Sequence, residues 1–506
     1  MSARSDLLGR TVPIAVGQWR PWLPALGVLG MALVAMGIMF TTEVLAAVRT
    51  WDRSSAYNHC WLVLPVAGWL AWTRREGLAG VAPTPIPLVA ILALAGAMVW
   101  LVMERLGVME GRQFAALGLI WVLALAVLGW RVCAAMAAPL AYLVFLVPFG
   151  EFATPWLQDV TLWMIVLGLR ALDITHHVDG LLIEIPAGAF LVAEACAGLR
   201  FLIASLAFGA LYALVMFRSP GRRVLVMVLA FVVPLVANGF RALGIVLLGH
   251  HLGSAEAAAV DHVVYGWVFF SLVLVLLTLA GLPFRQDGAG QASLAAAVPL
   301  HPIPRIHGRG LSRLVLAAGL TLGLASIGPL IAAGLETGAS RPAEEAVALT
   351  APAGCQTQGM ALRCGDYLVN ARLVTFEPGG TWTKVATSRR RALGEADDEA
   401  FIFAVRTPSM QWQGRQSAEQ GGLVAAGAWL GGQPVGDGLR TRATHAWQAL
   451  WGMGSLPVLV IVTLLPIADG AAHDASRMEE RRIMQAVLAA QEAGLASLAA
   501  QRSLRP

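Results

Sequence analysis

Residues 194–217 read EACAGLRFLIASLAFGALYALVMF, a short polar stretch that leads into a long apolar one. The apolar part, residues 197–217, has the length that a helix needs to cross a bilayer, about 20 residues. Cys196 lies at its first turn, between Glu194 and Arg200. The stretch therefore predicts a membrane span that carries a thiol, flanked by opposite charges, at one of its ends.

The composition of the whole chain predicts more such spans. Hydrophobic residues make up 57% of the 506 residues and charged residues only 13%, which is about half the charged share of an ordinary soluble domain. The arginines lie in short clusters between apolar runs, as the positive-inside rule predicts for cytoplasmic loops. The net charge of +5 is therefore a topology signal, and nucleic acid is not an expected partner.

Nine apolar runs are predicted to cross the membrane, and the first begins from a cytoplasmic amino terminus. They are residues 23–48, 57–72, 86–103, 114–130, 134–147, 197–217, 224–248, 262–282 and 314–334. Residues 154–172 are a further apolar run, but Gln158, Asp159 and Thr161 near its start indicate an amphipathic helix at the interface or against the bundle. Parity agrees, since the arginine loops at 74–75 and 218–223 are both cytoplasmic only if this run does not cross.

Between this helix and Cys196 the pattern changes. Residues 181–185 and 189–193 flank Pro186-Ala187-Gly188, which predicts two short strands around a turn. Extended backbone at membrane depth is tolerated only where it is buried in protein or lines a cavity. The hairpin is therefore predicted to form a wall of a site.

Three reactive residue types from consecutive spans are predicted to lie in one layer at the outer face. Three crossings after the arginine loop at 74–75 place Cys196 outside. Arg241 lies about 18 residues beyond Arg223, roughly 27 Å along a helix that starts inside. His262 opens the following span from the outside. The topology thus brings a thiol, a guanidinium and an imidazole to the same depth.

This combination has the chemistry of nucleophilic catalysis. A nearby imidazolium or guanidinium favours the thiolate form of a cysteine, so His262 is suited to take the proton of Cys196 and return it to a leaving amine. Arg241 keeps its charge, is costly inside an apolar span and can stabilise an oxyanion. The three residues are therefore the candidate catalytic group.

Three neighbouring polar residues are candidate substrate-binding groups: Asn238, Arg200 and Glu194. Asn238 precedes Arg241 by three residues and shares its helix face, so it can add a hydrogen-bond donor. Glu194 and Arg200 flank the cysteine, and an ion pair between them that supports the loop is the structural alternative.

The stretches Val192-Ala193-Glu194-Ala195-Cys196-Ala197-Gly198-Leu199-Arg200 and Ala237-Asn238-Gly239-Phe240-Arg241, followed by His262, resemble the signature of the exosortase/archaeosortase family. The resemblance covers about residues 20–285, and Ala197 stands where many members carry serine. It implies a bacterial inner-membrane cysteine transpeptidase with its active site outside. Such an enzyme cleaves carboxy-terminal sorting signals of exported proteins, of the Pro-Glu-Pro type, through a cysteine thioester. The acyl group passes to a membrane lipid or another lipid-linked acceptor, and no cofactor is implied.

The resemblance and the hydropathy together predict the fold class and the domains. We expect an all-α polytopic membrane protein of about 8–9 transmembrane helices with a small, β-rich, extracytoplasmic C-terminal domain, as some bacterial exosortases have. The expected parts are an exosortase-like catalytic domain (1–285), a cytoplasmic linker (286–313), an additional transmembrane helix (314–334), the β-rich domain (335–450) and a candidate terminal hydrophobic segment with a basic tail (451–506).

Inside the C-terminal part, finer predictions are possible. Residues 367–376, 381–387 and 401–407 alternate like strands, residues 453–468 are a short candidate for a last span, and residues 477–506 read as a basic helix that ends in disorder. Cys355 and Cys364 flank what looks like a hairpin in an oxidising compartment, so a disulfide between them is predicted.

Two alternatives compete with this interpretation. Asp173, His176, His177 and Asp179 could hold a metal, as could His250 and His251, but adjacent histidines on a helix point about 100° apart and share a ligand poorly. A transporter or lipid-linked glycan handling protein could use the buried Arg241 as a binding site. Such a protein should have inverted repeats with interrupted helices, and the sequence has no evident repeat.

Overall fold

The computed structural model describes residues 22–78, 81–253, 262–286, 309–336, 342–377, 379–393, 401–407, 410–416, 422–450, 455–467 and 474–504. The chain divides into two compact units. The first, here called the bundle, comprises Met1–Ala97 and Gln113–Ser326. The second comprises Met98–Arg112 and Ile327–Pro506. Helices α4 and α14 cross from one unit to the other.

The helices follow the predicted apolar runs. They are α1 (Trp22–Met39), α2 (Thr41–Arg53), α3 (Cys60–Thr73), α4 (Leu92–Leu106), α5 (Met109–Leu128), α6 (Trp130–Ala135), α7 (Ala137–Tyr142), α8 (Thr154–Ala171), α9 (Leu199–Met216), α10 (Pro220–Leu252), α12 (His262–Gly281) and α14 (Arg309–Glu336). Within the described residues seven helices, or eight counting one bent pair, are long and apolar enough to cross a membrane, and three shorter apolar helices accompany them. The protein is therefore a multi-pass membrane protein, as predicted.

The first predicted span, residues 23–48, is two helices rather than one. The chain breaks at Phe40, and α2 beyond it is amphipathic, with Glu43, Ala47 and Trp51 buried. The polar residues of α2 interrupt the apolar surface that a lipid-facing helix needs, which the hydropathy of the whole run conceals. The fifth predicted span is also composite, because α7 continues into a 3-10 turn, Leu143–Leu146.

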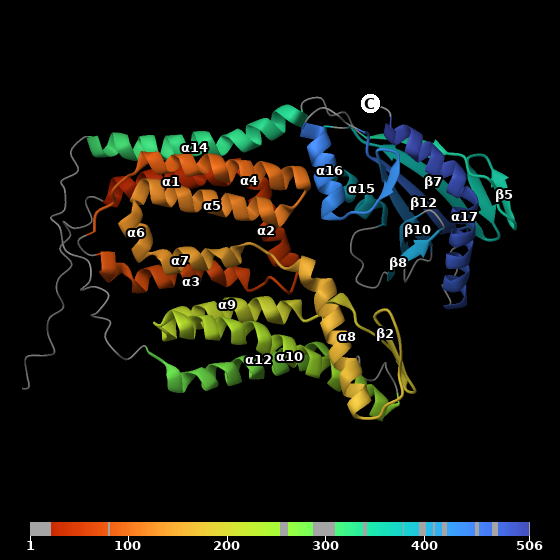
Figure 1. Cartoon of the computed structure of the whole chain (residues 1–506), viewed down its shortest axis with the longest axis horizontal. Coiled ribbons are helices and arrows are strands. Elements are labelled where there is room, and N and C mark those ends of the chain that lie inside the picture. Colours follow the sequence, from red (N-terminus) through yellow and green to blue (C-terminus); the bar gives the residue numbers. More distant parts are fainter. Residues whose placement is uncertain are drawn as a thin grey trace, which may run out of the picture. The chain divides into compact units, whose positions relative to one another are not determined.

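Helix α8 corresponds to the predicted amphipathic helix. It is long and apolar enough to cross a membrane, yet Figure 1 shows it running across the direction that α9, α10 and α12 share. Its aromatic side chains Trp156 and Trp163 are exposed. This arrangement fits a helix that lies across the end of the bundle, which is the placement that parity required.

The predicted hairpin is confirmed. Strands β2 (Leu182–Ile185) and β3 (Gly188–Leu191) pair antiparallel, and β1 (His177–Asp179), which the sequence did not predict, pairs with β2. Buried residues of the hairpin pack against α8 and the second half of α10 in one apolar cluster: Ile165, Leu169, Ile183, Ile185, Val192, Ala242 and Val246. The hairpin is therefore fixed to the two helices that flank the candidate site.

The C-terminal part, residues 343–504 and here called the sheet domain, is built on one nine-stranded sheet. Its strands are β4 (Ala343–Val347), β5 (Cys355–Gln358), β6 (Ala361–Cys364), β7 (Tyr367–Thr375), β8 (Phe401–Arg406), β9 (Gln411–Gln416), β10 (Leu423–Leu430), β11 (Gln433–Val435) and β12 (Val458–Pro466). The main order is β5-β6-β7-β12-β10-β9-β8, with β4 on β7 and β11 on β10. Helix α17 (Asp474–Leu504) packs on one face, and α15 (Trp382–Leu393) packs on the other. A further helix, α16 (Leu439–Leu450), follows β11.

Three predictions for this part are wrong. Residues 453–468 do not form a last span, because β12 lies there at the centre of the sheet, between β7 and β10. Both faces of β12 are buried, and such strands read as continuous apolar runs. Residues 381–387 are not a strand but the start of α15. The tail does not end in disorder, since α17 reaches Leu504 and its residues Met484, Val487, Leu488, Leu495 and Ala499 are buried on the sheet. The domain predicted to end at residue 450 thus extends to residue 504.

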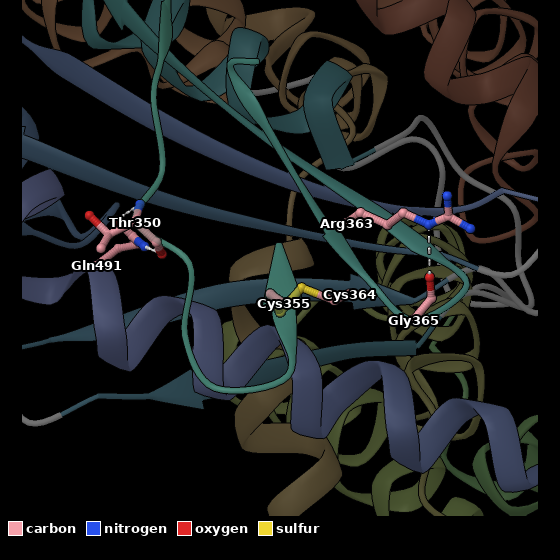
Figure 2. Close-up of a disulfide and its surroundings, with 6 residues drawn as sticks. All are labelled: Thr350, Cys355, Arg363, Cys364, Gly365 and Gln491. Atoms are coloured by element: carbon pink, nitrogen blue, oxygen red, sulfur yellow. Dashed lines mark hydrogen bonds between the residues drawn. A yellow bond between two sulfur atoms is a disulfide. The ribbon is translucent and has the colours of Figure 1, made fainter. Parts of the chain in front are cut away.

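The predicted disulfide is confirmed. Cys355 on β5 and Cys364 on β6 are directly opposite each other, their Cα atoms are 4.2 Å apart, and the two sulfur atoms are bonded. Figure 2 shows the bond joining the two strands, with Gln491 of α17 bound to Thr350 beside it; the backbone nitrogen of Thr350 donates to Gln491 Oε1 at 3.0 Å. Disulfides persist in oxidising compartments, which supports an extracytoplasmic location.

The turn between α4 and α5 belongs to the second unit. Arg105 Nη1 donates to the carbonyl of Gly379 at 3.0 Å, and Arg442 Nη1 donates to the carbonyl of Gly107 at 3.0 Å. The turn and the sheet domain therefore lie on the same side of the membrane. Most of the predicted cytoplasmic linker lies outside the described residues.

Candidate active site

The cysteine lies in the connection between the hairpin and α9. After β3 the chain forms a 3-10 turn, Glu194–Cys196, in which the backbone nitrogen of Cys196 donates to the carbonyl of Ala193 at 2.9 Å. Gly198 follows with φ +82° and is the N-cap of α9. Cys196 is half-buried. It therefore lies just before the start of α9 with part of its surface accessible.

Asn238 connects this turn to α10. Its Nδ2 donates to the carbonyl of Cys196 at 2.9 Å and to Thr161 Oγ1 of α8 at 3.2 Å. Its Oδ1 accepts from Arg241 Nε at 3.4 Å. The amide of Asn238 thus joins α8, the cysteine turn and Arg241. Asn238 is buried, with 3% of its surface exposed. The predicted neighbourhood of Cys196, Asn238 and Arg241 is present.

Arg241 is a fully buried charged residue in this neighbourhood, with 1% of its surface exposed. Its guanidinium carbon lies 5.3 Å from the ring centroid of Phe201, and that of Arg200 lies 5.1 Å from the same ring. Cations within about 6 Å of an aromatic centroid are attracted to the ring. Phe201 in turn packs on Phe270 of α12, with centroids 4.7 Å apart. The aromatic pair therefore ties α9 to α12 beneath the arginines.

The close approach of the turn to Asn238 requires glycine at position 198. A Cβ atom there would lie 2.5 Å from Asn238 Cγ, and the positive φ is one that residues with side chains rarely adopt. Gly239 has the same role on the opposite side, where a Cβ atom would lie 2.2 Å from Met164 Sδ of α8. The two glycines allow α9, α10 and α8 to meet closely at Asn238.

The remaining predicted residues have different positions. Glu194 is exposed at the turn, and among the ion pairs of the described residues none joins it to Arg200. Arg200 is half-buried and lies over Phe201. His262 is the first residue of α12, but its side chain lies outside the described part, so its catalytic role stays a prediction.

Two residues of the site were not predicted. Gln158 Nε2 donates to the carbonyl of Val192 at 2.8 Å, and Thr161 accepts from Asn238. Both were noticed only as polar positions of an amphipathic helix. Their spacing of three residues, which places them on one helix face, is the signal that could have pointed to a shared role.

The metal alternative receives no support from the described residues. None of their His, Cys, Asp and Glu side chains form a group of three or more that could hold an ion. His177 lies on strand β1 rather than on a helix. The rings of His250 and His251 have centroids 5.7 Å apart at the end of α10.

The geometry so far defines a multi-pass membrane protein in which a thiol-bearing turn and a buried arginine are joined at one end of the helices. Residues 51–279 match the family model described as Transmembrane exosortase. This matched part of the chain contains Cys196, Asn238, Arg241 and His262, and it is similar to the exosortase family of membrane protein-sorting transpeptidases. No curated protein and no solved structure matches the chain.

Proposed function

We propose that this protein is a cysteine transpeptidase that cleaves carboxy-terminal sorting signals of exported, membrane-anchored proteins. The observation that carries the proposal is the amide of Asn238, which joins the carbonyl of Cys196 to the guanidinium of Arg241. A nucleophile and an oxyanion-stabilising cation are thereby held in one small region of a chain segment that matches the exosortase family.

The proposed reaction begins with the Cys196 thiol. His262 takes the thiol proton while the sulfur attacks a peptide carbonyl of the sorting signal, and a tetrahedral oxyanion forms. Arg241 stabilises this oxyanion; groups of this kind are worth roughly 3–4 kcal/mol of barrier each. The C–N bond then breaks, and His262 returns the proton to the leaving amine.

The products of this step are a thioester on Cys196 and a released carboxy-terminal helix that stays in the bilayer. A nucleophile on a membrane lipid or lipid-linked carrier attacks the thioester, transfers its proton to His262 and restores the thiol. If water attacks instead, the enzyme acts as a peptidase. The predicted location supports this substrate class, because a membrane-anchored tail presents a peptide bond near the depth predicted for Cys196.

We infer the side of the membrane from the order of the predicted crossings. The sheet domain, which carries a disulfide, shares a side with the turn between α4 and α5. We take α5 and the apolar segment Ala137–Leu146 as two crossings and α8 as lying across the helices, which returns Cys196 to the same side. We place the active site on the extracytoplasmic face of a bacterial inner membrane.

The proposal is tested with a reporter protein that ends in a Pro-Glu-Pro motif, one apolar helix and an arginine cluster. Co-expression with the intact chain should shorten the reporter. Cys196→Ser, Arg241→Ala and His262→Ala should each remain in the membrane and leave the reporter unprocessed. Cys60→Ala and Cys133→Ala, which remove the other free thiols of the described residues, are matched controls and should process it normally.

A further inference from the structure

We propose that α8 is the positioning element of the nucleophile, and that Gln158 and Thr161 hold the cysteine turn in place from its two sides. The inference rests on the proposed function, because it assigns these residues a role in the reaction of Cys196. Neither residue touches the reacting sulfur, so both act through the backbone and through Asn238.

The orientation of α8 points to this role. Its large apolar residues Trp156 and Trp163 are 49% and 63% exposed, whereas Gln158 and Thr161 are 8% and 1% exposed. The same inward face also carries the buried apolar residues Leu157, Ile165 and Leu169, so the two polar residues interrupt an otherwise apolar contact with the bundle. Leaving a buried polar group without a partner costs about 1–3 kcal/mol, so inward polar residues are retained where they have partners.

The partners of Gln158 and Thr161 connect them to the cysteine turn. Gln158 binds the carbonyl of Val192, which is four residues before the cysteine. Thr161 binds the amide of Asn238, which binds the carbonyl of Cys196 itself. The backbone of the turn is thus held at two points, and both holds originate on one face of α8. With these two points held, the direction in which Cys196 presents its side chain is restricted.

The hydrogen-bond partners of Asn238 fix the orientation of its amide. The carbonyl of Cys196 can only accept a hydrogen bond, so the nitrogen of the amide must face it. Its second hydrogen is directed to Thr161, and its oxygen is thereby turned toward Arg241 Nε. Both amide hydrogens have protein acceptors, so Asn238 is better understood as a positioning residue than as the substrate-binding donor predicted from the sequence.

These contacts give Thr161 a specific consequence. When the hydroxyl of Thr161 is removed, Asn238 loses one of the two acceptors that fix its amide. The amide can then rotate, and it no longer holds the cysteine turn and Arg241 in a fixed relative position. Errors of about 1 Å in the placement of a reacting group can lower a rate by about a hundred-fold. The loss should appear in kcat, since neither residue is placed to bind the substrate.

The test uses Thr161→Val, which keeps the shape and removes the hydroxyl, and Thr161→Ser, which keeps the hydroxyl. Cleavage of the reporter with the Pro-Glu-Pro tail is measured in membranes as a function of reporter amount. Thr161→Val should lower kcat about ten- to hundred-fold with KM changed less than about two-fold, and Thr161→Ser should restore most of kcat. Gln158→Met should act in the same direction.

The matched controls are Gln113→Met and Thr278→Val. Gln113 is a buried glutamine that donates to the carbonyl of Glu43, and Thr278 binds a carbonyl of its own helix. Both variants lose comparable hydrogen bonds elsewhere in the bundle and should retain kcat. Equal losses in controls and site variants would indicate general destabilisation and overturn the inference.

The outcomes separate this inference from the proposed function. If Cys196→Ala abolishes cleavage while Thr161→Val and Gln158→Met cleave like the wild type, the positioning role is wrong and the proposed function stands. If Cys196→Ala cleaves at the wild-type rate, the proposed function itself fails. If Thr161→Val does not accumulate in the membrane, the comparison of Gln158→Met with Gln113→Met decides the question.

Discussion

Helix α10 and strand β12 are both rich in valine and leucine, and they have opposite surroundings. On α10 the apolar residues Val224 and Val228 are 62% and 50% exposed, while Asn238 and Arg241 are buried. On β12 the residues from Val458 to Val462 are all at most 2% exposed. An apolar residue that is exposed in a chain of this composition faces lipid, and a polar residue that is buried there needs a partner. Burial, rather than hydropathy, therefore distinguishes a membrane span from the core of a soluble domain.

The largest expected effect concerns the side of the membrane. An alkaline phosphatase reporter, active only outside, should be silent when fused at residue 300 and active when fused at residue 400. The reason is that α14 crosses once between these positions and the arginine clusters keep the preceding loops in the cytoplasm. Activity at 300 with silence at 400 would invert the topology, and Cys196 would then lie at the inner face.

The core of the sheet domain gives the next largest effect. Val460 of β12 is fully buried, in the cluster that α17 covers. Val460→Asp places a charge there and should destabilise the domain by more than about 4 kcal/mol. Limited proteolysis of the full chain in membranes should then degrade the domain. Leu439→Asp, at a residue that is 67% exposed, is the control and should resist like the wild type. A resistant Val460→Asp would mean that β12 is not in a soluble core.

The pH dependence of the sheet domain follows from His445. Burial, together with the smaller effect of the nearby guanidinium of Arg105, lowers the pKa of His445 to about 4. In the unfolded chain His445 binds a proton as the pH falls through about 6.5, whereas in the folded domain it stays neutral there. The contribution of neutral His445 to the free energy of unfolding is therefore full above about pH 6.5. It falls as the pH falls toward 4, by on the order of 3 kcal/mol.

Thermal unfolding of the full chain measures this effect. The wild type should lose stability between pH 6.5 and pH 4.5 relative to His445→Phe, because phenylalanine cannot be protonated. The substitution keeps an aromatic ring against Trp382, whose ring centroid lies 5.6 Å from that of His445. If both proteins lose the same stability over this interval, His445 does not titrate as its burial requires.

The smallest expected effect is that of the disulfide. Cys355→Ser combined with Cys364→Ser should lower the free energy of unfolding of the sheet domain by about 2–3 kcal/mol, because the crosslink closes a short loop. Reduction of the wild-type protein should produce the same change, and it should produce no change in the double variant. Equal labelling of the wild type by a thiol reagent before and after reduction would show that the bond is absent.

Several features could be predicted from the sequence because local chemistry decides them. Runs of about 20 apolar residues indicate spans, and Pro186 with Gly188 marks the turn of the hairpin. The arrangement of Cys196, Asn238 and Arg241 was also predictable, since topology alone brings the start of one span and the end of the next to the same depth. His262 was predicted in the same way, and its side chain is not among those described.

Other features depended on contacts that a sequence does not display. The run from Val458 to Pro466 lacks alternation because helices cover both faces of the sheet. The segment at 381–387 contains several threonines, which favour strands, but Trp382, Val385 and Ala386 recur at helical spacing and are buried on the sheet. Gln158 and Thr161 were interpreted only as polar positions of an amphipathic helix at the interface or against the bundle, and the structure shows that they face the protein.

The central claim is that Cys196 forms a covalent thioester with the cleaved protein. The most direct measurement purifies the chain after co-expression with the Pro-Glu-Pro reporter and examines it by denaturing gel electrophoresis. The account predicts a larger species that contains both proteins, is dispersed by neutral hydroxylamine and is absent in Cys196→Ala. A reporter processed at the wild-type rate by Cys196→Ala, or an adduct that persists without this cysteine, would contradict the account.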